Sequence, residues 1–187
     1  KVNEPLISGN EKKYLLKCLS SGYISSGGSF VTEFENKFAK KVKRKYGISV
    51  SNGTAAIQLA FESLNLKKGE EVIVPCETFI ATGTSVTLNG GNLVFGEIDS
   101  DTFCMTLDEI KRRVTKNTKG VIIVHFGGYV SPDTLLIRDY CKKNKLFLIE
   151  DAAPALGSYV KNKSVGSYGD FACFSFHETK NFQCGMG

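Results

Sequence analysis

The sequence predicts an α/β protein with a mostly parallel sheet that is covered by helices on both faces. Short apolar runs alternate with longer amphipathic stretches, which is the pattern of βα units that feed a parallel sheet. The apolar runs are continuous rather than alternating with polar residues, and this is typical of strands that are buried on both faces.

Two amphipathic helices are expected first, near residues 9–20 and 31–45. The basic run KKVKRKYG at 40–47 falls at the end of the second helix, where cations complement the helix dipole. Strands and helices then alternate. The expected strands are GISVS (47–51), EVIVP (71–75), LVFGEI (93–98), GVIIVHF (120–126), LFLIE (146–150) and FACFSF (171–176), and the helical patterns lie near 54–65, 79–89, 107–114 and 133–144.

Composition excludes several classes of protein. The chain has 187 residues, of which 42% are hydrophobic, so it can bury a core as one domain or as part of a larger one. Its charge of +5 is spread along the chain, so we do not expect nucleic-acid binding. No apolar run could span a membrane, and residues 1–10 lack the apolar segment of a signal peptide. The six cysteines form no CxxC pair, which indicates reduced thiols in a cytoplasmic protein and no metal site.

The residues that follow the expected strands form a chemical set. Ligands of open α/β sheets bind at the carboxyl ends of the strands. Here those ends carry a turn that could bind an anion, an aromatic ring, a carboxylate, a hydroxyl group and an amine. This set suits pyridoxal phosphate, which needs a lysine for a Schiff base, an acid for its ring nitrogen, a face to stack on and backbone amides for its phosphate.

The stretch SNGTAAIQLA places Gly53 and Thr54 where a helix begins after a strand. Free backbone N–H groups at a helix start can bind phosphate. An ordinary N-cap by Asn52 or Thr54 explains the same residues equally well.

The stretch LFLIEDAA ends an apolar run with two acids, Glu150 and Asp151. Successive strand residues point to opposite faces, so only one of them can face a given ligand. Asp151, at the tip, is the better candidate to pair with a pyridinium nitrogen. The alternative is an acid that satisfies local amides.

Phe79, in PCETFIAT, could lie against the cofactor ring, although taken alone it would be interpreted as a core residue. Ser175 follows the last strand and could reach the phosphate. His125 ends another strand and is expected to be a hydrogen-bonded supporting group, whereas His177 is expected to be structural.

Lys180 follows Ser175 by five residues, in SFHETKN. A lysine shielded from water loses part of its preference for the charged form and can then act as a nucleophile and a proton shuttle. A solvent-exposed lysine without a role is the alternative, and the other strand ends argue against it.

Six segments in order and spacing resemble the nucleotide-sugar aminotransferases of the DegT type, which are fold type I pyridoxal-phosphate enzymes. The resemblance runs from about residue 5 to the end of the chain. The segments are GYISSGGSFVTEFENKFA, VSNGTAAIQLA, GEEVIVPCETFIAT, VHFGG, LIEDAAPALGS and VGSYGDFACFSFHETKN.

The resemblance implies a role for each candidate. Lys180 would form the Schiff base, Asp151 would pair with the ring nitrogen and Phe79 would stack on the ring. The phosphate site would consist of Gly53, Thr54 and Ser175. The implied reaction moves an amino group from glutamate, which leaves as 2-oxoglutarate, to a nucleotide-linked ketosugar by a ping-pong route. The segment SFHETKN and the N-terminal segment are most similar to those of enzymes that aminate C4 of a 4-keto-6-deoxyhexose. A homodimer is also implied.

Three departures from the family pattern stand out. Pro154 replaces the usual glutamine after EDAA, and Met186 replaces an acid after the lysine. The family's large domain also continues past the lysine with an antiparallel strand, and a small C-terminal domain follows. We therefore expect residues 1–187 to be an N-terminal arm plus most of the cofactor-binding large domain of a protein about twice as long, with the small domain outside this chain.

Two other interpretations remain. A truncated or decayed paralogue could bind the cofactor or a partner subunit without turnover, as Pro154 and Met186 suggest. A dinucleotide-binding dehydrogenase fits the alternating pattern, but no GxGxxG follows the first expected strand, where the turn reads SNGTAA.

Overall fold

A computed structural model describes residue 4 and residues 6–185, and its chain divides into two compact units, one up to Ser49 and one from Val50 on. The first unit holds two helices, α1 (Glu11–Ser21) and α2 (Ser29–Lys41). The rings of Tyr14 and Phe30 meet edge to face at 5.6 Å and join these helices. Lys40 and Lys41 lie in the last turn of α2, which supports the helix-end explanation of the basic run.

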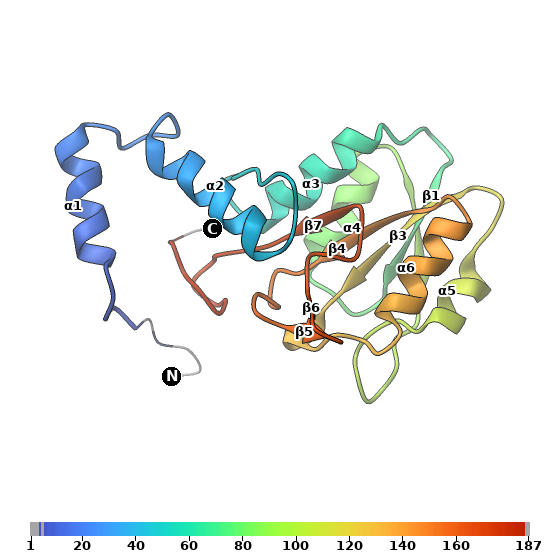
Figure 1. The fold of residues 1–187 in the computed structure, drawn as a ribbon. Helices are drawn as coiled ribbons and strands as arrows, with labels where there is room; N and C mark the ends of the chain where they lie inside the picture. The colour runs from blue at the N-terminus through green and yellow to red at the C-terminus, as the bar shows by residue number, and fades with distance from the viewer. Residues whose placement is uncertain (1–3, 5, 186–187) are drawn as a thin grey trace. The chain divides into compact units, whose positions relative to one another are not determined.

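The second unit is built on a five-stranded sheet in which every neighbouring pair is parallel, as predicted (Figure 1). The strand order is β2-β1-β3-β4-β7. The strands are β1 (Glu71–Pro75), β2 (Asn92–Gly96), β3 (Thr118–Val124), β4 (Phe147–Asp151) and β7 (Phe171–Cys173).

Helices cover both faces of the sheet, which confirms the predicted layers. The helices are α3 (Gly53–Leu64), α4 (Ile80–Leu88), α5 (Leu107–Arg113) and α6 (Thr134–Lys143). Val72 and Val74 of β1 pack with Phe61 of α3 in one core, and Ile73 between them packs with Ile110 of α5 in the other. Figure 1 shows α3 and α4 on one side of the sheet and α5 and α6 on the other. Alternate strand residues therefore belong to different layers.

The predicted strand at 47–51 is wrong, because the structure assigns no strand between α2 and α3. A strand exists through its ladder of hydrogen bonds, and in the described residues nothing pairs with this segment. The predicted strand at 171–176 is also too long, since β7 ends at Cys173, where its pairing with β4 ends. Two short elements were not predicted: a 3-10 turn η1 (Phe126–Gly128) and a hairpin of β5 (Tyr159–Val160) and β6 (Lys163–Ser164).

Candidate active site

The candidate residues from the second unit gather at the carboxyl ends of the strands. Asp151 is the last residue of β4, and Ser175 lies two residues beyond the end of β7. Gly53 opens α3 and lies against Ser175: a Cβ atom built on Gly53 would be 3.0 Å from Ser175 Cβ and 3.4 Å from its Oγ. The helix start and the strand end therefore meet at a point where a larger residue would have to displace Ser175.

The start of α3 keeps two backbone N–H groups for a ligand. Asn52 Oδ1 accepts the Ala55 N–H at 2.9 Å, and its carbonyl accepts the Ala56 N–H at 3.1 Å. The N-cap explanation therefore holds for Asn52. In the described part of the chain no acceptor uses the N–H groups of Gly53 and Thr54, so an anion could bind there beside Ser175 without displacing the cap.

Asp151 is buried at the tip of β4, with 4% of its surface exposed. Its Oδ2 accepts a hydrogen bond from Thr82 Oγ1 at 2.7 Å, and its Oδ1 accepts the Ala153 N–H at 3.2 Å. Burial raises the pKa of Asp151 above its usual range, although the hydrogen bonds from Thr82 and Ala153 and the charges of His125 and Lys180 oppose the rise. Such a carboxylate lacks full compensation for its burial and is suited to a cationic partner.

Glu150 points to the other face of β4 and is saturated with donors. Its Oε2 binds His125 Nε2 at 3.1 Å and the Gly166 N–H at 2.8 Å, and its Oε1 accepts the N–H groups of Tyr168 and Gly169, each at 2.7 Å. Burial alone would raise the pKa of Glu150, but its hydrogen bond with His125, the charge of His125 and the backbone donors outweigh burial and lower it. Glu150 therefore ties the loop at 166–169 to the sheet.

Phe79 lies immediately before α4 as its N-cap residue, and 71% of its surface is exposed. Its carbonyl accepts the Thr82 N–H at 3.0 Å, so the first turn of α4 fixes its backbone. An exposed ring on a fixed backbone can stack on a ligand, and this exposure argues against the core-residue alternative.

Lys180 lies half-buried in a closed loop after β7. Its N–H donates to the His177 carbonyl at 2.9 Å, and the loop is closed by the Cys184 N–H, which donates to the Phe176 carbonyl at 2.9 Å. The charge of Lys180 acts on Asp151 and lowers the pKa of that carboxyl against the effect of burial. The amine and the carboxylate thus lie within electrostatic reach of each other.

The other residues singled out in the sequence have simpler settings. His125 is buried with only 1% exposed and bonds to Glu150, as expected of a supporting group. His177 Nδ1 lies 3.2 Å from Thr179 Oγ1 within its own loop. Pro154 sits in a turn where the Ala155 N–H donates to the Ala152 carbonyl at 2.9 Å. Met186 lies outside the described residues.

Sequence reasoning missed Thr82, which is fully buried on α4 and donates to Asp151. Its oxygen lies 2.8 Å from Thr78 Oγ1. The local sequence PCETFIAT gives no sign of this contact, because 69 residues separate Thr82 from Asp151.

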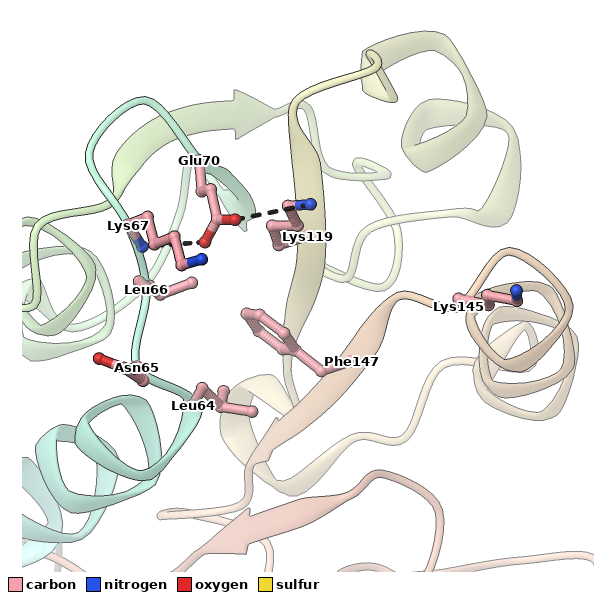
Figure 2. A pocket seen from close by; sticks show the side chains of 8 residues that line it. All are labelled: Leu64, Asn65, Leu66, Lys67, Glu70, Lys119, Lys145 and Phe147. Carbon is pink, nitrogen blue, oxygen red and sulfur yellow. Dashed lines mark hydrogen bonds and ion pairs between the residues drawn. The ribbon is translucent and has the colours of Figure 1, made fainter.

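An open pocket of about 410 Å³ lies at the opposite, amino ends of the strands (Figure 2). It is lined by Leu64, Asn65, Leu66, Lys67, Glu70, Lys119, Lys145 and Phe147. Glu70 already accepts the Lys67 N–H at 2.9 Å and pairs with Lys119 at 3.5 Å. None of the predicted cofactor residues lines this pocket, so we place the candidate site at the other edge of the sheet.

The described residues offer no cluster of metal ligands and no membrane-spanning helix. No group of three or more His, Cys, Asp or Glu side chains there is arranged to hold a metal ion. None of the helices described is both long enough and apolar enough to cross a membrane. All six cysteines are free thiols.

A sequence model of the DegT/DnrJ/EryC1/StrS aminotransferase family matches residues 5–187. Among curated proteins, GDP-perosamine synthase of Vibrio cholerae is 41% identical over 186 residues, which cover 100% of this chain and 50% of that protein. The chain thus spans about half the length of the curated relatives it matches.

Solved structures of aminotransferase-fold proteins superpose on this chain. An aminotransferase from Psychrobacter cryohalolentis superposes with a TM-score of 0.89 at 34% identity, covering 96% of this chain and 46% of that one. The E. coli GDP-4-keto-6-deoxy-D-mannose-3-dehydratase with bound hydrated PLP superposes with a TM-score of 0.91 at 26% identity, covering 97% and 48%. Both matches cover the parallel sheet and its helices, and one of these structures holds PLP.

Proposed function

Because this chain belongs to the DegT/DnrJ/EryC1/StrS aminotransferase family, we propose that it forms the cofactor-binding part of a pyridoxal-phosphate-dependent nucleotide-sugar aminotransferase. The amino group would pass from glutamate to the keto carbon of a nucleotide-linked 4-keto-6-deoxysugar by a ping-pong route. A family member with a different named reaction, the dehydratase above, also binds PLP. Family membership alone therefore does not fix the reaction.

The observation that carries the proposal is the setting of Asp151. A carboxylate that is almost fully buried, with a pKa raised by burial and only partly lowered by its donors, is suited to a cationic ring nitrogen. The phosphate end fits as well, since Gly53 lets the start of α3 approach Ser175 and two N–H groups remain available there. The residues present therefore fit pyridoxal phosphate.

Each candidate residue would have a defined task in the loaded enzyme. The cofactor, when bound, supplies an electron sink for the carbanion formed at the substrate's α-carbon. Asp151 would hold a proton on the ring nitrogen. Phe79 would cover one face of the ring, and Gly53, Thr54 and Ser175 would bind the phosphate. Lys180 would bond the cofactor through its Nζ and later move a proton at the reacting carbon.

The relatives support a nucleotide-linked sugar as the substrate class. The name GDP-perosamine synthase denotes a nucleotide-linked amino sugar, and two further relatives with this name are 40% and 38% identical to the chain. We propose the same class here, with amination at C4. We also propose that the whole protein is a cytoplasmic homodimer and that this chain provides its N-terminal arm and most of its large domain, with a small C-terminal domain beyond.

The alternative is a paralogue that binds the cofactor without turnover. It is favoured by Pro154, whose ring has no side-chain donor where the family pattern has glutamine. An exchange of the amino group separates the two possibilities. Glutamate should bleach the absorbance of the bound cofactor and release 2-oxoglutarate in a working enzyme, whereas a decayed paralogue would keep its spectrum.

The test uses the whole protein loaded with pyridoxal phosphate. After glutamate has bleached the cofactor, a GDP- or dTDP-linked 4-keto-6-deoxyhexose should restore the original spectrum and appear as an amino sugar by mass spectrometry. Bleaching by glutamate without recovery by either sugar would reject the substrate class. Absence of bleaching would reject the aminotransferase itself.

A further inference from the structure

Thr82 is a buried hydroxyl whose hydrogen bonds are fully determined. It is 0% exposed, and it donates its proton to Asp151 Oδ2 at 2.7 Å. A hydroxyl group has one proton, so the 2.8 Å contact between Thr82 and Thr78 must be donated by Thr78. Two hydroxyls in series therefore direct their protons toward the carboxylate.

The Asp151 carboxylate is fixed by one donor on each oxygen. Thr82 binds Oδ2 from α4, and the Ala153 N–H binds Oδ1 from the turn after β4. A carboxylate has about four acceptor positions, so the group keeps further capacity for a ligand while its plane is held. Hydrogen bonds to the ionised form also favour that form.

Thr82 links Asp151 to the proposed stacking residue. Its backbone N–H donates to the Phe79 carbonyl at 3.0 Å, and its side chain donates to Asp151. One turn of α4 therefore sets the backbone of the aromatic residue and the orientation of the acid. Because the backbone contact survives a side-chain substitution, the effect of the hydroxyl on Asp151 can be measured separately.

On the basis of the function proposed above, we propose that Thr82, oriented by Thr78, is a positioning residue that holds the Asp151 carboxylate ionised and aimed at the ring nitrogen of pyridoxal phosphate. The hydroxyl acts through Asp151 and does not touch the reacting atoms. Its removal should weaken cofactor binding and change the pH at which the bound cofactor alters its spectrum.

The pH dependence has other contributors near Asp151. His125, which follows β3, and Lys180 of the closed loop act on this carboxyl, and Glu150 and Cys173 are its titratable neighbours on β4 and β7. Since Thr82→Val leaves all four in place, a difference between this variant and the wild type reports the missing hydroxyl.

The test compares Thr82→Val, Thr82→Ser and Thr87→Val in the whole protein. Thr87 lies on the same helix, is exposed and donates to the Thr84 carbonyl at 3.0 Å, so it is a matched control. The readouts are the Kd for pyridoxal phosphate by absorbance titration and the pH dependence of the bound spectrum. We expect roughly tenfold weaker binding and a shifted pH profile for Thr82→Val, the factor typical of a hydrogen bond to a charged group. Thr82→Ser, which keeps a hydroxyl group, should retain the wild-type Kd and pH profile, and Thr87→Val should match the wild type.

Wild-type binding and an unchanged pH profile in Thr82→Val would overturn this inference. If Thr82→Val does not fold, Thr78→Val replaces it as the test, because this substitution removes only the donor to Thr82. Smaller changes of the Kd and of the pH profile in Thr78→Val would support the role of Thr82. Wild-type values of both would overturn it. Asp151→Asn separates this inference from the function on which it rests. Altered binding in Asp151→Asn with wild-type behaviour in the threonine variants defeats only the role of Thr82, whereas no change in Asp151→Asn defeats the proposed site.

Discussion

The two faces of β4 at its tip carry neighbouring acids with opposite settings. Glu150 accepts hydrogen bonds from His125 and three backbone N–H groups, and its pKa is lowered. Among the described residues, Asp151 accepts hydrogen bonds from Thr82 and Ala153 alone, and burial raises its pKa. Glu150, whose hydrogen-bond donors all come from the protein, therefore serves the fold. Asp151, which is buried with fewer donors, is the candidate for binding a ligand.

Replacing Glu150 should have the largest effect on stability. In Glu150→Gln one acceptor oxygen becomes an amide that faces backbone N–H groups, so buried donors lose their partner. Breaking a buried charged network of this kind costs about 3–5 kcal/mol. Urea unfolding of the cofactor-free whole protein checks the loss, with the exposed Glu62→Gln as a control. A loss no larger than that of the control would contradict the structural role.

The acid dependence of unfolding sharpens this result. The folded pKa of Glu150 lies below its unfolded value, so its contribution is fully present above about pH 4.5 and is lost as the pH falls through the folded pKa. The difference in free energy of unfolding between wild type and Glu150→Gln should therefore shrink below that pH. A constant difference would show that Glu150 acts through shape alone.

Replacing Asp151 should weaken cofactor binding without destabilising the cofactor-free protein. We expect Asp151→Asn to lower the affinity for pyridoxal phosphate at least tenfold and to stabilise the cofactor-free protein by about 1 kcal/mol. The folded pKa of Asp151 is raised, so its stability contribution is complete below the unfolded pKa and is lost as the pH rises through the folded one. The substitution should remove this pH dependence of the free energy of unfolding, which sets in as the pH rises above the unfolded pKa of the carboxyl. Destabilisation similar to that of Glu150→Gln would erase the contrast between the two acids.

Pro154→Gln should have the smallest effect. The substitution adds a side-chain donor in the turn between Ala152 and Ala155 without altering either acid. We expect a two- to threefold gain in affinity for pyridoxal phosphate, the size of a weak net hydrogen bond. Absorbance titration beside Pro132→Gln, a proline outside the site, provides the measurement and its control. A loss of affinity would show that proline at position 154 binds the cofactor better than glutamine does in this chain.

The sequence was sufficient for the strands that carry the site. Phe147–Asp151 is a continuous apolar run that ends in acids, and it forms β4 within one residue of the prediction because both faces of that strand are buried. The segment GISVS at 47–51 was also predicted as a strand, yet no strand forms there, since pairing depends on a neighbour that local composition does not encode.

The residues of the candidate site could be predicted where local sequence patterns mark them. Gly53, Ser175 and Asp151 follow from their positions beside strands or helix starts, which local patterns reveal. Thr82 could not be found, because a threonine in a helix carries no mark of a partner 69 residues away on another element. Contacts between elements that arise from packing alone are the part that needs the structure.

We propose that Lys180 bonds pyridoxal phosphate beside Asp151. The most direct test is borohydride reduction of the cofactor-loaded whole protein, followed by peptide mass spectrometry, for wild type, Lys180→Ala and the exposed control Lys116→Ala. We predict a fixed adduct on Lys180 in the wild type and in the control, and none in Lys180→Ala. An adduct on another lysine, or an equal yield in Lys180→Ala, would show that Lys180 does not bond the cofactor.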